Sequence, residues 1–310
     1  MECTFDIILT GADVVLPSMK KEKLDIGILD SKINQLGDLS RAKSKDRINL
    51  KGLLVIPGAI DTQVHFREPG LTHKEDIFHG TKGAILGGVT TIFEMPNTNP
   101  PTTNLIELKK KVLIAEKNAY CNFSFFLGAS KDNIKNINKL ENESGCCGVK
   151  IFMGSSTGDL LVEDDEYILK ILKVAKRMVA VHSEDEFRLR ERMNFFSNDD
   201  ISVLDHPKIR DVLSAVTSTK RLINVAKKAN KKIHILHIST KEEIPILREN
   251  KKILSCEVTP QHLFFSSPEC YETLGSLSQM NPPIRDESHK EALWNALTEG
   301  VIDVIGSDHA

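Results

Sequence analysis

The amino-acid sequence predicts an α/β protein with a TIM-like (β/α)8 barrel. From residue 53 onward, apolar runs of strand length alternate with longer segments of helical periodicity. Eight such runs occur, and strands that alternate with helices form a parallel sheet, which eight strands can close into a barrel. Polar residues follow several of the runs, and a barrel gathers its functional side chains at these strand ends.

The expected strands and helices follow one another without an internal repeat or a low-complexity segment. The strands span residues 53–60, 89–95, 122–127, 147–152, 179–182, 233–238, 253–258 and 301–306. The helices include residues 74–86, 105–118, 164–177, 212–230 and 241–250. Because the chain ends at Ala310, directly after the eighth strand, we expect the barrel to lack its last helix.

The first 52 residues differ from the rest of the chain. Short β-like runs at 5–9, 24–29 and 33–36 are separated by turn residues such as Gly11 and Gly37. They predict a small antiparallel sheet. We therefore expect two domains: residues 1–52, the N-terminal part of a small β-sandwich, and residues 53–310, a barrel that is incomplete at its C-terminal end.

The composition of the chain indicates which class of partner and which cellular compartment to expect. The net charge is -2 and acidic residues are interleaved with basic ones, which argues against nucleic acid or a membrane surface as the main partner. No apolar run approaches the roughly 18 residues that span a bilayer. Residues 1–10 do not resemble a signal peptide, and the six cysteines lack C-x-x-C spacing. We therefore expect a cytoplasmic protein with reduced thiols.

The polar residues at the expected strand ends are typical metal ligands. Gln63, His65 and Arg67 share one parity, so they point the same way if the first strand continues to its end. The later strand ends contribute Asn97, Lys150, His182, His237 and Asp308. A single strand-end histidine is usually structural, but three of them with an aspartate favour a metal site. Nitrogen and oxygen donors without a thiolate suit a hydrolytic Zn, Mn or Fe site.

One strand contains two histidines that compete for the same role. His234 and His237 are three residues apart, so on a regular strand they face opposite ways. Only one of them can then face the barrel interior. We expect it to be His237, which lies at the strand end.

Lys150 and Asp308 have residue types that carry hydrolytic chemistry. Lys150 is flanked by apolar residues, and a buried ammonium is costly unless it is paired or neutral. A neutral amine can react with CO2 to give a carbamate that bridges two metals, whereas the alternative is a lysine that reaches the strand end or pairs with a carboxylate. Asp308 suits a general base beside a metal, although a helix N-cap is the alternative.

Six motifs lie in order along nearly the whole chain. They are H-F-R-E-P-G at 65–70, M-P-N-T-N-P-P at 95–101, G-V-K-I-F-M-G-S-S-T-G at 148–158, V-H-S-E-D at 181–185, N-P-P-I-R at 281–285 and S-D-H-A at 307–310. As a set they resemble the motifs of dihydroorotases, which belong to the amidohydrolase superfamily of metal-dependent (β/α)8 barrels. The combination of R-E-P-G with M-P-N-T is specific, whereas a strand-end H-x-H alone would indicate only the superfamily.

This resemblance implies a site with two zinc ions and a small-molecule substrate. The implied metal ligands are His65, carboxylated Lys150 as the bridge, His182, His237 and Asp308, and Asp308 is also the general base. Arg67, Asn97 and Asn281 would hold the substrate, with Arg67 making a bidentate contact to its carboxylate. The implied reaction is the reversible cyclisation of N-carbamoyl-L-aspartate to L-dihydroorotate in pyrimidine synthesis.

The sequence departs from the family pattern at two places. Gln63 stands where the superfamily usually has the first histidine of H-x-H, and a glutamine oxygen is a weaker zinc ligand. The family usually continues D-H-A-P-H, and the last histidine of that motif contacts the substrate carboxylate; here the chain ends at Ala310. Two other interpretations therefore stay open: a hydantoinase, dihydropyrimidinase or allantoinase, against which Arg67 argues, and a non-catalytic homologue. A homo-oligomer is compatible with the sequence.

Overall fold

The computed structural model describes residues 4–155, 160–196 and 201–310. The chain divides into two compact units, Met1–Ala59 and Ile60–Ala310, whereas the boundary expected from the sequence follows residue 52. The apolar run at 53–60 was expected to be a single barrel strand, and this is wrong. Leu54–Val55 (β5) belongs to the N-terminal sheet and Ala59–Val64 (β6) to the barrel. Pro57 and Gly58 separate the two, because proline lacks the N–H that a ladder requires.

The N-terminal unit is one five-stranded sheet, consistent with part of a small β-sandwich. Its other strands are β1 (Thr4–Val15), β2 (Lys21–Leu29), β3 (Lys32–Gly37) and β4 (Lys43–Asn49). The strand order is β3-β2-β1-β4, and β5 also pairs with β1. The predicted antiparallel pairing is confirmed for β1, β2 and β3. The sheet also contains β4 and β5, which were not predicted in it and which run parallel to β1. The chain crosses the sheet after β3 and returns on the far side of β1, which reverses the direction of pairing.

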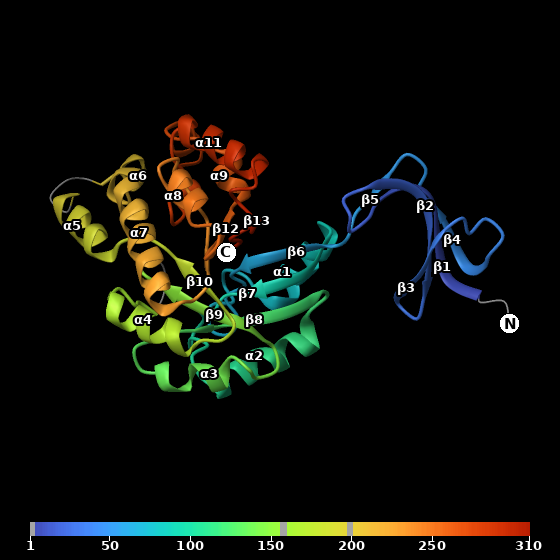
Figure 1. Ribbon diagram of the computed structural model, residues 1–310, viewed down its shortest axis with the longest axis horizontal. Coiled ribbons are helices and arrows are strands. Elements are labelled where there is room, and N and C mark those ends of the chain that lie inside the picture. The colour runs from blue at the N-terminus through green and yellow to red at the C-terminus, as the bar shows by residue number, and fades with distance from the viewer. Residues whose placement is uncertain (1–3, 156–159, 197–200) are drawn as a thin grey trace. The chain divides into compact units, whose positions relative to one another are not determined.

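The second unit contains eight strands in sequence order, so the predicted (β/α)8 architecture is confirmed. The strands are β6, β7 (Val89–Glu94), β8 (Asn122–Gly128), β9 (Cys146–Phe152), β10 (Met178–His182), β11 (Ile233–Ile235), β12 (Leu254–Val258) and β13 (Val304–Ile305). A parallel bridge joins Val64 to His309, and the Asp308 N–H donates to the Gln63 carbonyl at 2.9 Å. The last strand thus returns to the first, and Figure 1 shows the C-terminus beside β6.

Helices surround the strands (Figure 1). They are α1 (Ile77–Leu86), α2 (Leu105–Asn118), α3 (Ile137–Leu140), α4 (Asp165–Val174), α5 (Glu186–Phe196), α6 (His206–Ile209), α7 (Val212–Ala229), α8 (Glu243–Glu249), α9 (Pro260–Phe264), α10 (Glu269–Leu274) and α11 (Glu287–Thr298), with 3-10 turns at Ile134–Asn136, Val203–Asp205 and Gly275–Ser278. The five predicted helices correspond to α1, α2, α4, α7 and α8. The longest, α7, begins at an Asp211 cap and ends at Asn230, whose φ of 50° stops the helix.

The main apolar core lies between the strands and the helices. Val149 and Ile151 of β9 pack there with Ile168 and Leu222 from α4 and α7. Since strand side chains alternate, Lys150 between them points into the barrel. The same alternation directs polar residues of the neighbouring strands inward, so the barrel interior is the place for the site.

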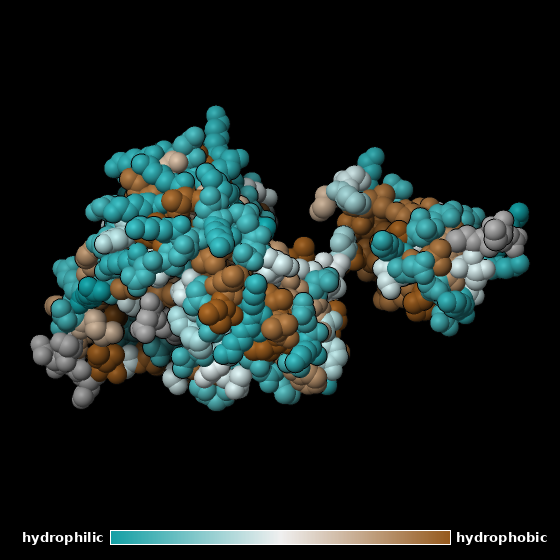
Figure 2. All heavy atoms as spheres, turned by 90° about the horizontal axis from the view of Figure 1, so that it is seen from below, coloured by the Kyte–Doolittle hydropathy of each residue, from teal (hydrophilic) through white to brown (hydrophobic). Residues whose placement is uncertain are grey.

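The surface of the barrel unit mixes apolar and hydrophilic side chains, as Figure 2 shows for one face. On α2, for example, Ile106 and Leu113 are exposed next to Lys109 and Lys110. None of the helices in the described part of the chain has the length and apolar character needed to cross a membrane.

Candidate metal centre

The side chains expected to bind metal converge at the carboxyl ends of the barrel strands. His65 and Gln63 come from β6 and the residues after it, Lys150 from β9 and His182 from the end of β10. His237 follows β11 and Asp308 follows β13. All are buried except Asp308, whose side chain is 12% exposed. The structure therefore brings together the expected ligands, which come from five of the eight strands.

The first group of donors surrounds Asp308. Its Oδ1 lies 3.0 Å from His65 Nε2 and accepts a hydrogen bond from Gln63 Nε2 at 2.8 Å. His65 Nδ1 bonds Asn97 Oδ1 at 2.7 Å, which directs the other ring nitrogen at Asp308. Burial favours the neutral form of Asp308, but the hydrogen bond and charge of His65, with the charges of His237 and Lys150, lower its pKa to about 2. Asp308 is therefore a carboxylate at neutral pH.

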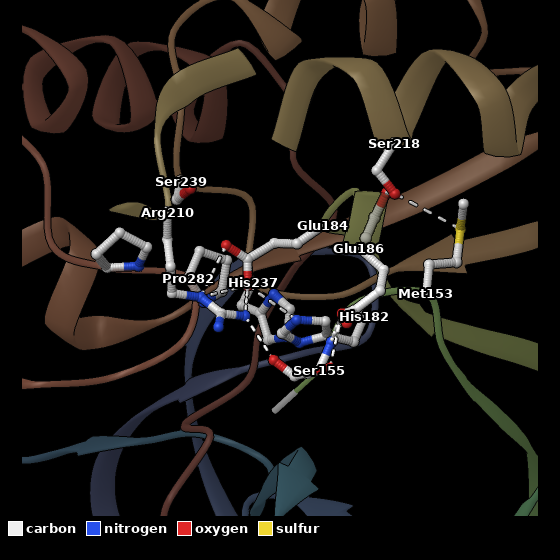
Figure 3. Close-up of polar contacts among 12 residues, drawn as sticks. Met153, Ser155, His182, Glu184, Glu186, Arg210, Ser218, His237, Ser239 and Pro282 are labelled. Carbon is white, nitrogen blue, oxygen red and sulfur yellow. Dashed lines mark hydrogen bonds and ion pairs between the residues drawn. The ribbon is translucent and has the colours of Figure 1, made fainter. Parts of the chain in front are cut away.

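The second group of donors is a pair of imidazoles. His182 Nδ1 and His237 Nε2 face each other at 3.0 Å, and the two rings meet edge to face (Figure 3). Burial is the main cause that lowers the pKa of both histidines, well below the ordinary value for His237. Neutral imidazoles are the form that binds metals. Two unprotonated ring nitrogens could thus be offered to one ion.

The positive charge of Lys150 acts on both groups of donors. It lowers the pKa of each member of the following set: His65, His182, His237 and Asp308. Its Nζ is buried and has no hydrogen-bond partner among the described residues; it sits 4.6 Å from the centre of the Phe152 ring. Burial lowers the pKa of Lys150 to about 7, although Asp308 and Glu257 favour the charged form. Of the two alternatives from the sequence, this environment favours the neutral amine.

These donors fit divalent metal ions. Lys150 Nζ and Gln63 Oε1 are buried polar atoms without hydrogen-bond partners in the described part of the chain, and the amide of Gln63 also contacts Asp308. Oxygen and imidazole donors of this kind suit zinc and related ions.

Backbone strain concentrates at the same residues. Arg67, His237 and Asp308 have φ values of 63°, 39° and 50°, in the left-handed region that costs a non-glycine residue about 1–3 kcal/mol. Outside the site, the other non-glycine residues of this kind among those described are Met19, Asp30, Ser31 and Asn230. Such strain persists where the surroundings over-determine it, and it is typical of functional sites.

The prediction that His234 and His237 face opposite ways is wrong. His234 Nε2 bonds Glu257 Oε2 at 3.2 Å, and the same carboxylate accepts from Thr62 Oγ1 at 2.8 Å across the barrel. His234 therefore also faces the interior, one layer below the site. Strand β11 ends at Ile235 and His237 adopts its left-handed φ, so the alternation that separated the two histidines is broken.

Of the expected substrate-binding residues, Arg67 and Asn97 lie beside His65, whereas Asn281 lines a cavity whose described lining residues include none of the expected metal ligands. Arg67 is buried, and its Nη1 donates to the Asn97 carbonyl at 3.5 Å. Asn281 comes from the loop before α11 instead of a strand end, and its buried Oδ1 has no hydrogen-bond partner among the described residues. It lines a cavity of about 570 Å³ together with Ser155 and Arg210.

The sequence motifs contact one another in space. The Asn99 N–H of M-P-N-T-N-P-P donates to the Pro69 carbonyl of R-E-P-G at 3.0 Å. Gly70 has a φ of 90°, and a Cβ there would collide with the Asn99 carbonyl, so only glycine fits. The two motifs thus form one structure at the ends of β6 and β7. The last part of the third motif, residues 156–158, lies outside the described residues.

Two charged residues next to His182 were not predicted from the sequence. Glu184 Oε2 lies 2.9 Å from His182 Nε2, and Arg210 pairs with Glu184 (Figure 3). Burial would raise the pKa of Glu184, but Arg210 and His182 hold it well below its ordinary value. Glu184 stands two residues after His182 in V-H-S-E-D, which is a signal for its position. Arg210 has no comparable signal.

A different cluster, Glu75, Asp76 and His79, also places metal-binding atoms close together among the described residues. It forms the first turn of α1, where Asp76 Oδ1 already accepts the His79 N–H as a helix cap. We assign it this capping role only.

The sequence of the chain is similar to those of known amidohydrolases. A model of the amidohydrolase family matches residues 54–310. The chain is 35% identical over 298 residues to a dihydroorotase from Methanosarcina mazei, covering 92% of this chain and 65% of that protein. It is 30% identical to an allantoinase from Deinococcus radiodurans, covering 99% and 70%.

A solved structure agrees with this placement. An L-hydantoinase from Arthrobacter aurescens superposes with a TM-score of 0.93 at 25% identity, over 98% of this chain and 69% of that one. The chain spans 65% of the length of the Methanosarcina mazei relative.

Proposed function

The chain belongs to the amidohydrolase family, and from that premise we propose that it is a dihydroorotase, a hydrolase of cyclic amides that interconverts L-dihydroorotate and N-carbamoyl-L-aspartate in pyrimidine synthesis. The observation that carries the proposal is Arg67, a buried guanidinium two residues after the ligand His65. A fixed cation beside the reacting centre suits a ring that bears a carboxylate. The similarity to dihydroorotases supports the same choice.

We assign the metal ligands to two positions. His65, Asp308 and Gln63 would hold the first ion and His182 with His237 the second. A carbamate on Lys150 would bridge them. Divalent metals, which this family generally uses and which we propose to be two zinc ions, would supply Lewis acidity that polarises the ring carbonyl and acidifies the attacking water.

The chain's own residues would move the proton and hold the substrate. In the hydrolytic direction, water adds its oxygen to the ring carbonyl carbon and the carbonyl–nitrogen bond of the ring breaks. Asp308 accepts a proton from the water and donates it to the departing nitrogen. The products are a carboxylic acid, which ionises, and a ureido group; cyclisation reverses these steps. Arg67, Asn97 and Asn281 would orient the substrate.

Arg67 should set substrate choice. We expect Arg67→Met to lower kcat/KM for dihydroorotate by about 30-fold to several thousand-fold, because losing one partner of a buried charge pair costs about 2–5 kcal/mol. For dihydrouracil, the same ring without the carboxylate, kcat/KM should fall by less than about threefold. Steady-state kinetics on both substrates measures this difference. Equal losses on both would remove Arg67 from carboxylate recognition.

Gln63 should give the first metal position a lower affinity for zinc than a histidine would. We expect Gln63→His to raise the affinity for the first zinc ion by roughly tenfold or more, since imidazole is a better zinc ligand than an amide oxygen. Zinc content after titration with a chelator measures the change. Gln63→Leu, which removes the amide without adding a ligand, is the control and should bind zinc no more tightly than wild type. Identical affinities for all three proteins would contradict a ligand role at this position.

The similarity to an allantoinase and an L-hydantoinase keeps a related cyclic-amide hydrolase as the second candidate. A substrate without a ring carboxylate would then be preferred. A non-catalytic homologue would instead bind no zinc. We also propose a cytoplasmic location, because the cysteines in the described part of the chain are all free thiols.

A further inference from the structure

A buried chain of contacts connects Arg210 to His182 through Glu184 (Figure 3). Arg210 Nε donates to Glu184 Oε2 at 3.0 Å, and a second contact joins Arg210 Nη2 to the same oxygen. The same oxygen, Glu184 Oε2, also forms a hydrogen bond with His182 Nε2 at 2.9 Å. Glu184 has no exposed surface and the side chain of Arg210 is 12% exposed. The three residues therefore act on one another with little competition from solvent.

Arg210 is itself held from two sides. Its Nη2 donates to the Ser155 carbonyl at 2.8 Å, and its own carbonyl accepts from Arg285 Nη1 at 3.1 Å. Arg285 in turn donates from Nε to Ser239 Oγ at 3.1 Å. The guanidinium thus has a fixed place, from which it fixes the orientation of the Glu184 carboxylate.

This arrangement decides which nitrogen of His182 carries the proton. A guanidinium only donates hydrogen bonds and an ionised carboxylate only accepts them. Because Arg210 keeps Glu184 as an acceptor, His182 Nε2 must be the N–H donor of their bond. Nδ1 then keeps its lone pair, and Nδ1 is the atom that faces His237 Nε2 at 3.0 Å.

We propose that Glu184 and Arg210 are positioning residues that hold His182 in the Nε2–H tautomer, so that Nδ1 is available as a metal-binding atom. The inference rests on the metal-dependent function proposed above. It assigns a role to Arg210 that acts through Glu184 and not by contact with the metal or the substrate. Carboxylates behind ligating histidines usually change metal affinity by about 10- to 100-fold.

The decisive variant is Glu184→Leu/Arg210→Met. It removes the carboxylate that accepts from His182 Nε2–H, together with the guanidinium that would otherwise be left as a buried unpaired charge. Without that acceptor, Nε2–H loses its advantage and the proton can move to Nδ1. We expect zinc affinity to fall by about 10- to 100-fold.

The matched comparison is Glu184→Gln/Arg210→Met, which keeps an accepting oxygen for His182 Nε2–H. We expect this variant to keep the tautomer and most of the zinc affinity. Both double variants lack a buried unpaired charge, so both should fold.

The test combines nitrogen-15 NMR of the histidine rings in the metal-free protein with zinc affinity from competition with a chelator. His182→Ala assigns the signal of His182. Asp185→Asn is a control at the next residue, whose partner is Arg221, and should leave both readouts unchanged. The proposal is overturned if Glu184→Leu/Arg210→Met keeps the Nε2–H tautomer and wild-type zinc affinity, or if the two double variants behave alike.

Neither readout involves substrate. If the protein cyclised no carbamoyl-aspartate while Glu184→Leu/Arg210→Met still shifted the tautomer, the proposed function would fail and this inference would stand. If the activity were present and the tautomer unchanged, the reverse would hold.

Discussion

Replacing Lys150 with methionine should remove zinc from the site and lower the rate of cyclisation by about a thousandfold or more, since metal ions contribute several kcal/mol of transition-state stabilisation. Methionine keeps the length and the apolar stem and lacks only the amine. Because Lys150 Nζ is buried without a hydrogen-bond partner among the described residues, its loss should not destabilise the fold. We expect the Tm of the metal-free variant to equal or exceed that of the metal-free wild type.

The reason for this expectation is the charge state of the amine. CO2 reacts with neutral amines, and an ordinary lysine with a pKa near 10.4 is about 0.1% neutral at pH 7.4. Burial lowers the pKa of Lys150 to about 7, so much of it is neutral there. The neutral fraction rises as pH rises through that value. Uptake of 13CO2 by the metal-free protein should therefore be small near pH 6 and large near pH 8.

Carbon-13 NMR and zinc analysis measure both effects. The chain offers an internal control in Lys111, which is as deeply buried as Lys150 but pairs with Glu94 and donates to the Met95 carbonyl at 3.0 Å. Lys150→Met should show no carbamate signal although Lys111 remains. A variant that kept its zinc and its activity would exclude a bridging role for Lys150.

Asp308→Asn should lower kcat by about 100- to 10,000-fold, which is the usual contribution of general acid–base catalysis. The amide has the same shape and can still accept a hydrogen bond, but it cannot take up a proton at neutral pH. Asparagine also tolerates the left-handed backbone at this position, where φ is 50°. The loss should therefore reflect proton transfer and not misfolding. Steady-state kinetics at saturating zinc measures it.

The matched control for Asp308 is Asp303→Asn, which makes the same change on the approach to β13. Asp303 pairs with Lys251 at 2.6 Å, away from the donors of the site. It should keep kcat within about twofold, as surface substitutions usually do. Retention of more than about a tenth of the wild-type kcat by Asp308→Asn would rule out Asp308 as the proton carrier.

The barrel and most of its site could be predicted because both depend on local periodicity. Apolar runs alternate with helical segments, and the apolar residues on either side of Lys150 indicated that it is buried, as it is in the structure. The failures occur where local pattern is interrupted. Pro57 and Gly58 divide one apolar run between two units. The left-handed backbone at His237 breaks the alternation by which His234 and His237 were expected to face opposite ways.

Long-range contacts were out of reach for a different reason. Arg210 meets Glu184 through the turn that ends α6, and nothing in the local pattern of either residue specifies that meeting. Asn281 lies in the loop before α11 and not at a strand end, so strand periodicity gives no indication of its place. The mixed N-terminal sheet depends on a crossover, which residue alternation does not encode.

The most direct test of the account is the substrate preference of the zinc-loaded protein. We predict that kcat/KM for dihydroorotate, and for cyclisation of N-carbamoyl-L-aspartate, exceeds that for dihydrouracil, hydantoin and allantoin by at least about a hundredfold. A site built around a buried polar partner strongly rejects analogues that lack its counterpart. Preference for a ring without a carboxylate, or no turnover of dihydroorotate by protein that holds zinc, would contradict it.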